Sequence, residues 1–103
     1  MATRATIEFN FRTALSQADT IDEIADNLSR LSRTDFENAM QNLSAGWKGE
    51  NASLYLSKGS VLQGKMDGTS NSLHAVASDI RAVAKRIYDA EMAALEIAQN
   101  RTY

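Results

Sequence analysis

The sequence predicts an all-α protein, an antiparallel helix-turn-helix hairpin with long helices over about residues 11–43 and 50–99. The 103-residue chain contains no proline, so its composition permits very long helices. Apolar residues recur at spacings of three and four in both halves of the chain, which is the helical period. Between the halves, two glycines flank a tryptophan in a segment typical of a tight turn.

Residues 1–10 are predicted to form an N-terminal arm. Ile7, Phe9 and Phe11 alternate with polar residues, and this period of two fits a short extended segment. A frayed terminus is the competing interpretation. Asn10 is suited to cap the helix that follows.

The first helix, over residues 11–43, carries one apolar stripe and contains no glycine. Several aspartates and glutamates lie in its first half, where negative charge suits the helix dipole. The stripe consists of Ala14, Ala18, Ile21, Ala25, Leu28, Leu31, Phe36, Ala39 and Leu43.

Residues 44–49 are predicted to form the turn, in which Trp47 lies between Gly46 and Gly49. Glu50 follows as the acidic residue expected in the first turn of the second helix. Trp47 has two interpretations that are compatible with each other. Its ring covers the ends of the helices, or it forms part of a docking pocket shared with a partner chain.

The second helix, over residues 50–99, shows an uninterrupted heptad pattern. A loop over the polar segment 67–72 is the competing interpretation. The apolar pattern keeps its phase on both sides of that segment, which favours one helix that is weakened or bent near Gly68. The predicted seam of the hairpin and of a dimer comprises Ile21, Leu28, Leu31, Leu43, Leu62, Met66, Leu73, Val76, Ile80 and Val83.

Two helices cannot enclose a core, and the chain has no cysteine for a disulfide. We therefore expect residues 1–103 to form a single hairpin domain that dimerises into a four-helix bundle. A homodimer is the first expectation, and a heterodimer with a related hairpin is the alternative. With the turn centred near Trp47, Phe11 meets residues 83–85, and residues 86–103 project as a helical tail suited to recognition.

Composition argues against several classes of function. The net charge of -2 argues against nucleic-acid binding, and no apolar run is long enough for stable membrane insertion. The single histidine, His74, has Ser70, Asn71, Ala77 and Ser78 at helical spacing, so we expect a surface histidine rather than a metal ligand. No catalytic residue, metal site or cofactor is predicted, and the protein is not expected to be an enzyme.

The triplet Trp47-Lys48-Gly49, in mid-chain between two helical stripes, resembles the small Trp-x-Gly (WXG, ESAT-like) proteins exported by type VII (ESX or Yuk-type) secretion systems. The resemblance covers essentially the whole chain. It implies secretion from a cytoplasmic pool as a folded helical dimer, without a cleavable signal peptide. It also implies the type VII secretion ATPase as a partner.

In that family the export signal lies at or after the end of the second helix, with the pattern Tyr-x-x-x-Asp/Glu. This sequence departs from it, because Met92 stands four residues after Tyr88. A looser family pattern is matched, and the resemblance leaves open whether this chain carries the signal or travels with a partner that does. The alternative function is an intracellular adaptor that pairs with a larger type VII toxin. The candidate signal residues are Ile87, Tyr88, Glu91, Ala94 and Ala98.

Overall fold

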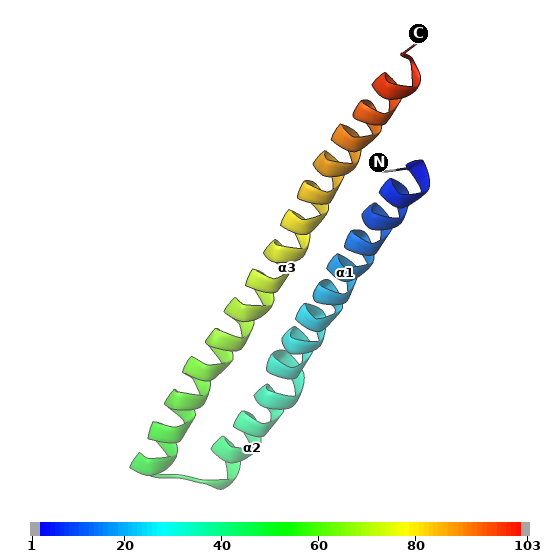
Figure 1. The fold of residues 1–103 in the computed structure, drawn as a ribbon. Coiled ribbons are helices and arrows are strands. Elements are labelled where there is room, and N and C mark those ends of the chain that lie inside the picture. Colours follow the sequence, from blue (N-terminus) through cyan, green and yellow to red (C-terminus); the bar gives the residue numbers. More distant parts are fainter. Residues whose placement is uncertain (1–2, 102–103) are drawn as a thin grey trace. The chain divides into compact units, whose positions relative to one another are not determined.

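The computed structural model describes residues 3–101, and the secondary structure of these residues is helical (Figure 1). Helix α1 spans Arg4–Arg30, the π-helical segment η1 spans Leu31–Phe36, α2 spans Glu37–Gly46 and α3 spans Glu50–Gln99. Because η1 joins α1 to α2 without a gap, the chain has one long helical arm before the turn and one after it. The predicted all-α class and hairpin character are confirmed for the described residues.

The predicted extended arm at the N-terminus is wrong, because residues 4–10 form the first turns of α1. Thr3 caps this helix: its Oγ1 accepts a hydrogen bond of 3.2 Å from the Thr6 N–H. Ile7 is only 3% exposed. Ile7 and Phe11 are four residues apart, a spacing that fits one face of a helix as well as one face of a strand. Asn10 therefore lies inside α1 and does not cap it.

The π-helical segment η1 was not predicted, but the sequence contains its cause. The less exposed positions of the first arm follow steps of three and four as far as Leu28. The next ones, Ser32, Phe36 and Met40, are each four residues further on. Consecutive steps of four exceed the α-helical period, and a wider π turn absorbs the extra residue while keeping these side chains on one face.

The turn depends on the backbone of one glycine. Helix α2 ends where the Trp47 N–H donates to the Leu43 carbonyl oxygen at 2.9 Å, and α3 begins where the Ser53 N–H donates to the Gly49 carbonyl oxygen at 3.1 Å. Gly49 has a φ of 114°, which side chains with a Cβ rarely adopt. The chain therefore reverses at residues 47–49, and the predicted turn over residues 44–49 is too long, because residues 44–46 form the last turn of α2.

Helix α3 has the predicted bounds and passes through the polar segment 67–72 as a helix, so the loop alternative is wrong. Gly68 stands in its interior without a break. Its less exposed positions repeat in steps of three and four. This row comprises Ala52, Leu56, Gly59, Gln63, Met66, Ser70, Leu73, Ala77, Ile80, Ala84 and Tyr88, and Asp67, His74 and Arg81 are half-buried beside it.

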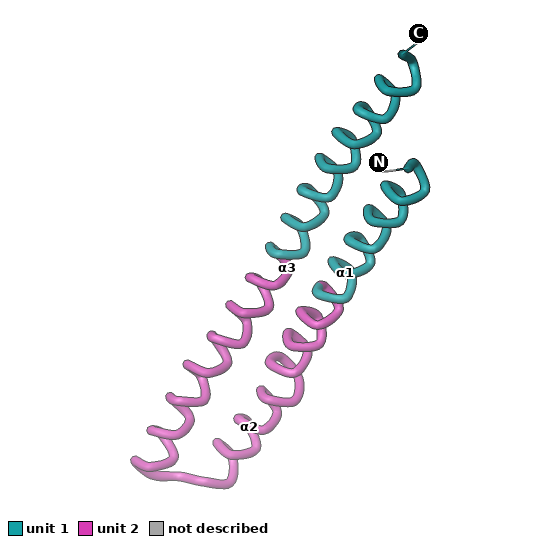
Figure 2. Tube along the Cα trace, viewed as in Figure 1, with its two compact units in different colours: residues 1–21, 75–103 teal, residues 22–74 magenta. Residues whose placement is uncertain are grey.

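The chain divides into two compact units, which we describe separately (Figure 2). Unit 2, residues 22–74, contains the end of α1, η1, α2, the turn and the first half of α3. Its helices run antiparallel, because Ser70 contacts Ala25 near the start of this unit's part of the first arm, whereas Gly59 lies against Phe36 and Met40 further along it. A Cβ at Gly59 would meet the Met40 side chain, so glycine permits this close approach.

Unit 1 consists of residues 1–21 and 75–103, of which 3–21 and 75–101 are described. Its helices also run antiparallel, since Arg81 pairs with Asp19 and Tyr88 stacks on Phe11. In both units the fully buried side chains are mostly small, which lets paired helices lie close together. The buried apolar residues are Ile7, Ala18, Ala77 and Ala84 in unit 1, and Ala25 and Ala52 in unit 2.

Candidate functional site

Trp47 lies at the turn of unit 2 with its side chain half-exposed. It is 40% exposed, and its ring stacks on Tyr55 with 5.6 Å between the centroids. The ammonium of Lys58 lies 5.8 Å from the centre of the Tyr55 ring, so a cation sits beside the aromatic pair. The stack fixes the indole against the first turns of α3 and leaves part of it available to another molecule.

The predicted signal residues lie on different faces of α3 in unit 1. Tyr88 and Glu91 are half-buried, whereas Ile87, Ala94 and Ala98 are exposed. The Tyr88 ring stacks on Phe11 with 4.6 Å between the centroids. The structure therefore brings Tyr88 and Glu91 to the side of α3 that faces α1.

Phe11 was predicted to meet residues 83–85, and it shares a groove with Ala84, but the prediction that the chain projects from residue 86 is wrong. Helix α1 begins earlier than expected, so residues 86–91 of α3 run beside its first turns. Side chains of a helix tilt toward its N-terminus, and in an antiparallel pair this tilt carries the two rings toward each other along the helices. Phe11 consequently contacts Tyr88.

A small groove lies between the first turns of α1 and the later part of α3. Its volume is about 200 Å³, and Glu91 lines it on the α3 side. Among the described residues, Glu91 has no ion pair, although it is half-buried. The groove thus combines apolar walls with one carboxylate that is open to a cationic group. Its other lining residues are Ile7, Asn10, Phe11, Ala14, Ala84, Ile87 and Tyr88.

Unit 1 also exposes an apolar stripe of α3 beside the face that packs on α1. Val76, Val83 and Ile87 are exposed, and Ile80 is half-buried between them. Together with Ala14 they border an open groove of about 370 Å³. These positions repeat at helical spacing, as one side of a helix–helix contact does.

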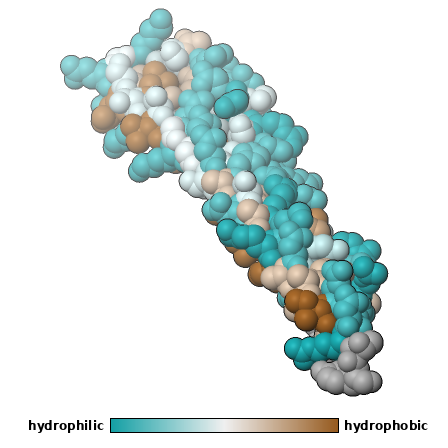
Figure 3. All heavy atoms as spheres, turned by 90° about the horizontal axis from the view of Figure 1, so that it is seen from above, coloured by the Kyte–Doolittle hydropathy of each residue, from teal (hydrophilic) through white to brown (hydrophobic). Residues whose placement is uncertain are grey.

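The predicted seam is divided by the structure into two sets. The first set is half-buried at the intrachain contact and comprises Ile21, Leu28, Leu43, Met66, Leu73 and Ile80. The second set is exposed and comprises Leu31, Leu62, Val76 and Val83. Figure 3 shows one face of the molecule as mostly hydrophilic with separate hydrophobic patches.

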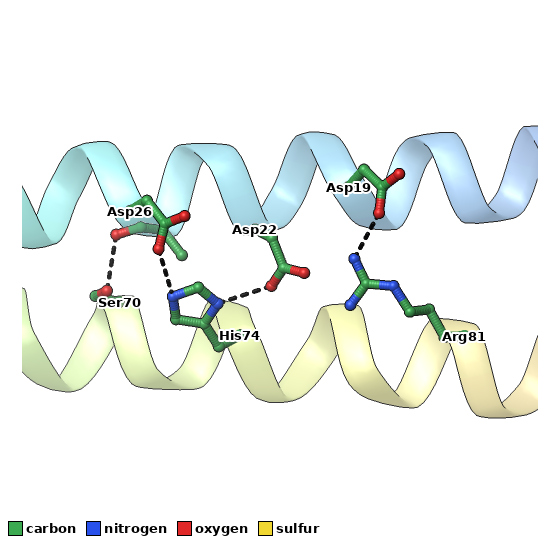
Figure 4. Close-up of polar contacts among 7 residues, drawn as sticks. Asp19, Asp22, Asp26, Ser70, His74 and Arg81 are labelled. Atoms are coloured by element: carbon green, nitrogen blue, oxygen red, sulfur yellow. Dashed lines mark hydrogen bonds and ion pairs between the residues drawn. The ribbon is translucent and has the colours of Figure 1, made fainter.

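His74 lies at a contact that sequence analysis did not predict. Its Nδ1 is 2.7 Å from Asp22 Oδ1, and its Nε2 is 3.1 Å from Asp26 Oδ1, so the imidazole lies between two carboxylates of α1 (Figure 4). The hydrogen bond to Asp22 raises the pKa of His74 above the usual 6.5 by more than desolvation lowers it, and the charges of Asp26 and Asp22 raise it further.

Other polar side chains join the paired helices within each unit. In unit 2, Ser70 Oγ donates to the Ala25 carbonyl oxygen at 2.8 Å, and Gln63 Nε2 donates to the Ser32 carbonyl oxygen at 2.9 Å. In unit 1, an Arg81 nitrogen lies 2.7 Å from Asp19 Oδ1 (Figure 4). In the sequence, the two contacts of unit 2 are indicated by polar residues, Gln63 and Ser70, at positions of α3 that face the other helix.

Two further kinds of site are absent from residues 3–101. No group of three or more His, Cys, Asp or Glu side chains within this range is placed to hold a metal ion. None of the helices in this range is long and apolar enough to span a membrane.

No protein-family model matches the chain, and no curated protein or solved structure is significantly similar to it. The resemblance to Trp-x-Gly proteins therefore depends on the triplet Trp47-Lys48-Gly49 and on its place between two long helices.

Proposed function

We propose that the protein is a non-enzymatic cargo of a type VII secretion system, exported as a folded helical dimer. The observation that carries the dimer is the exposed apolar stripe of α3, which lies beside the contact with α1, whereas the proposal of export rests on the resemblance at Trp47-Lys48-Gly49. A second hairpin packed on this stripe would remove it from water. A homodimer is the simplest form, and a heterodimer with a related hairpin is the alternative.

The proposed recognition surface has two parts, one in each unit. The first is the half-exposed Trp47 at the turn, and the second is the groove lined by Tyr88 and Glu91. In the proposed dimer, the turn of one chain and the α3 tail of the other form the surface bound by the secretion ATPase. The Glu91 carboxylate, which has no ion pair within the described part of the chain, is suited to a cationic group on that partner.

The primary test is the location of the protein in its native culture, with and without the type VII secretion ATPase. If the protein is exported by this system, it is found in the medium only when the ATPase is present. Release of equal amounts in both strains would contradict the proposal. Retention inside the cell in both strains would favour the alternative function, an intracellular adaptor that pairs with a larger type VII toxin.

The contribution of Glu91 is tested by Glu91→Ala, which we expect to abolish export because it removes the carboxylate of the groove. Glu96→Ala is the matched control, since Glu96 is an exposed glutamate of the same helix that does not line this groove. Immunoblots of medium and cells measure export, and circular dichroism verifies that both variants remain helical. Normal export of a folded Glu91→Ala variant would exclude this residue as the signal.

The adaptor alternative makes a different prediction for the purified protein. An adaptor that requires a larger partner is expected to be a monomer with reduced helicity when alone. An exported dimer is expected to be highly helical at twice the chain mass. Light scattering coupled to size-exclusion chromatography, together with circular dichroism, distinguishes the two.

A further inference from the structure

We propose that His74, Asp22 and Asp26 form a pH-sensitive clip that fastens the two helices of unit 2 when both imidazole nitrogens carry protons. The clip is independent of the proposed export, because it rests only on contacts within the hairpin. It joins α1 to α3 at the end of unit 2 away from the turn.

The geometry requires a particular protonation state. A neutral imidazole has one N–H donor and one acceptor, whereas the imidazolium has two donors. Each carboxylate oxygen can only accept. Because Nδ1 faces Asp22 and Nε2 faces Asp26, only the imidazolium satisfies both contacts at once. In the neutral state one of the two carboxylates faces a nitrogen lone pair, and that contact is lost.

The charged groups around His74 favour the same state. On α1, Asp22 and Asp26 contact the ring, and Glu23 lies between them in sequence. On α3, residues 70–78 contain no charged side chain other than the imidazolium itself. Beyond this range along α3, Asp79 lies five residues from His74, and Asp67 and Arg81 each lie seven residues away. Arg81, two turns away, pairs with Asp19.

The direction of the pH dependence follows from these contacts. The pKa of His74 in the folded chain is raised above 6.5, the value expected when the chain is unfolded. Its stabilising effect is therefore fully present below pH 6.5, and it is lost as the pH rises through the folded pKa. The hairpin is tighter in mildly acidic solution than in alkaline solution.

The direct test is an NMR titration of the full chain, in which the single histidine makes the imidazole signal unambiguous. We expect the native pKa to lie above the value measured in strong denaturant. Asp22→Asn with Asp26→Asn is expected to return it toward that value. Glu23→Gln is the matched control, since it removes one charge from the same turns but no contact to the ring. A native pKa at or below the denatured value would overturn the proposal.

Thermal unfolding supplies the second test. Between about pH 6 and about pH 8.5, we expect the Tm of the wild-type chain to fall. We expect the Tm of the His74→Gln variant not to show this decrease. Other groups that titrate in this range, such as the α-amino group, affect both proteins and cancel in the comparison. An equal fall in Tm for the two proteins would overturn the clip, even if the imidazole pKa were raised.

Discussion

At the scale of single residues, two buried serines at the helix contact of unit 2 differ in their partners. Ser70 is 3% exposed, and its hydroxyl donates to the Ala25 carbonyl oxygen. Ser32 is 0% exposed, and its hydroxyl has no hydrogen-bond partner among residues 3–101. A buried hydroxyl without a partner loses its hydration and gains nothing in return, so the two side chains are expected to affect stability in opposite directions.

This contrast gives a paired prediction. Ser70→Ala removes a hydrogen bond and is expected to destabilise the protein by about 1 kcal/mol. Ser32→Ala removes an unpaired hydroxyl and is expected to leave stability unchanged or raise it by up to about 1 kcal/mol. Urea unfolding of both variants and of the wild type measures the change in the free energy of unfolding that each substitution causes. A larger loss for Ser32→Ala than for Ser70→Ala would contradict the structure.

Only part of the candidate site could be predicted from the sequence. Trp47 and Glu91 were identified from the sequence because a family resemblance names their positions. The clip was not, because Asp22 and Asp26 come from a different helix from His74. Within α3 the neighbours of His74 are serines, asparagine and alanine, which indicate nothing about a carboxylate partner. Recognition of this contact requires the helix register to within a few residues.

At the scale of elements, the sequence predicts α3 well because its heptad pattern is continuous from Glu50 onward and no proline interrupts it. The start of the first arm was missed, because the spacing of Ile7 and Phe11 fits a strand and a helix equally well. The cap formed by Thr3 decides between them. The segment η1 was missed because its only signal is three consecutive steps of four among the inward positions.

The glycines of α3 give a prediction at this scale. Gly64 and Gly68 lie inside the helix, and nothing lies within 4 Å of a Cβ built on either of them. Gly64→Ala and Gly68→Ala are therefore each expected to stabilise the protein by about 0.5–1 kcal/mol through helix propensity. Gly49→Ala is the contrasting variant and is expected to destabilise it by at least about 1 kcal/mol, because of the positive φ.

Chemical unfolding followed by circular dichroism measures these three effects. Each variant makes the same glycine-to-alanine change, so its effect on the unfolded chain is the same at all three positions. Differences in stability between the three variants therefore report on the folded structure. A loss of stability in Gly64→Ala or Gly68→Ala would indicate that the added methyl group clashes with a group outside this chain, such as a partner molecule.

At the scale of the whole molecule, the main feature is the small size of the side chains that are fully buried. Many large apolar side chains remain exposed, among them Ile24, Leu62, Val76, Val83 and Ile87. A chain of this length gains little from its own core, and added apolar contact with a partner would raise its stability. The proposed dimer follows from this imbalance.

The prediction at this scale concerns Val83. In the proposed dimer, Val83→Glu places a charge in an apolar contact, which is expected to cost about 3 kcal/mol, or roughly a hundredfold in the dimer Kd. Ser78→Glu adds the same charge at an exposed position of the same helix and is expected to leave the dimer intact. Light scattering over a dilution series measures the mass of each variant. Unchanged masses for Val83→Glu across the series would exclude this stripe as the dimer contact.

The stacked indole at the turn also has a spectroscopic consequence. Trp47 is the only tryptophan of the chain, so its fluorescence comes from this turn alone. Because it is half-exposed beside Tyr55 and Lys58, its emission is sensitive to any molecule that displaces water there. The unlabelled protein thus carries its own optical reporter, which responds to ligands that dock at the turn.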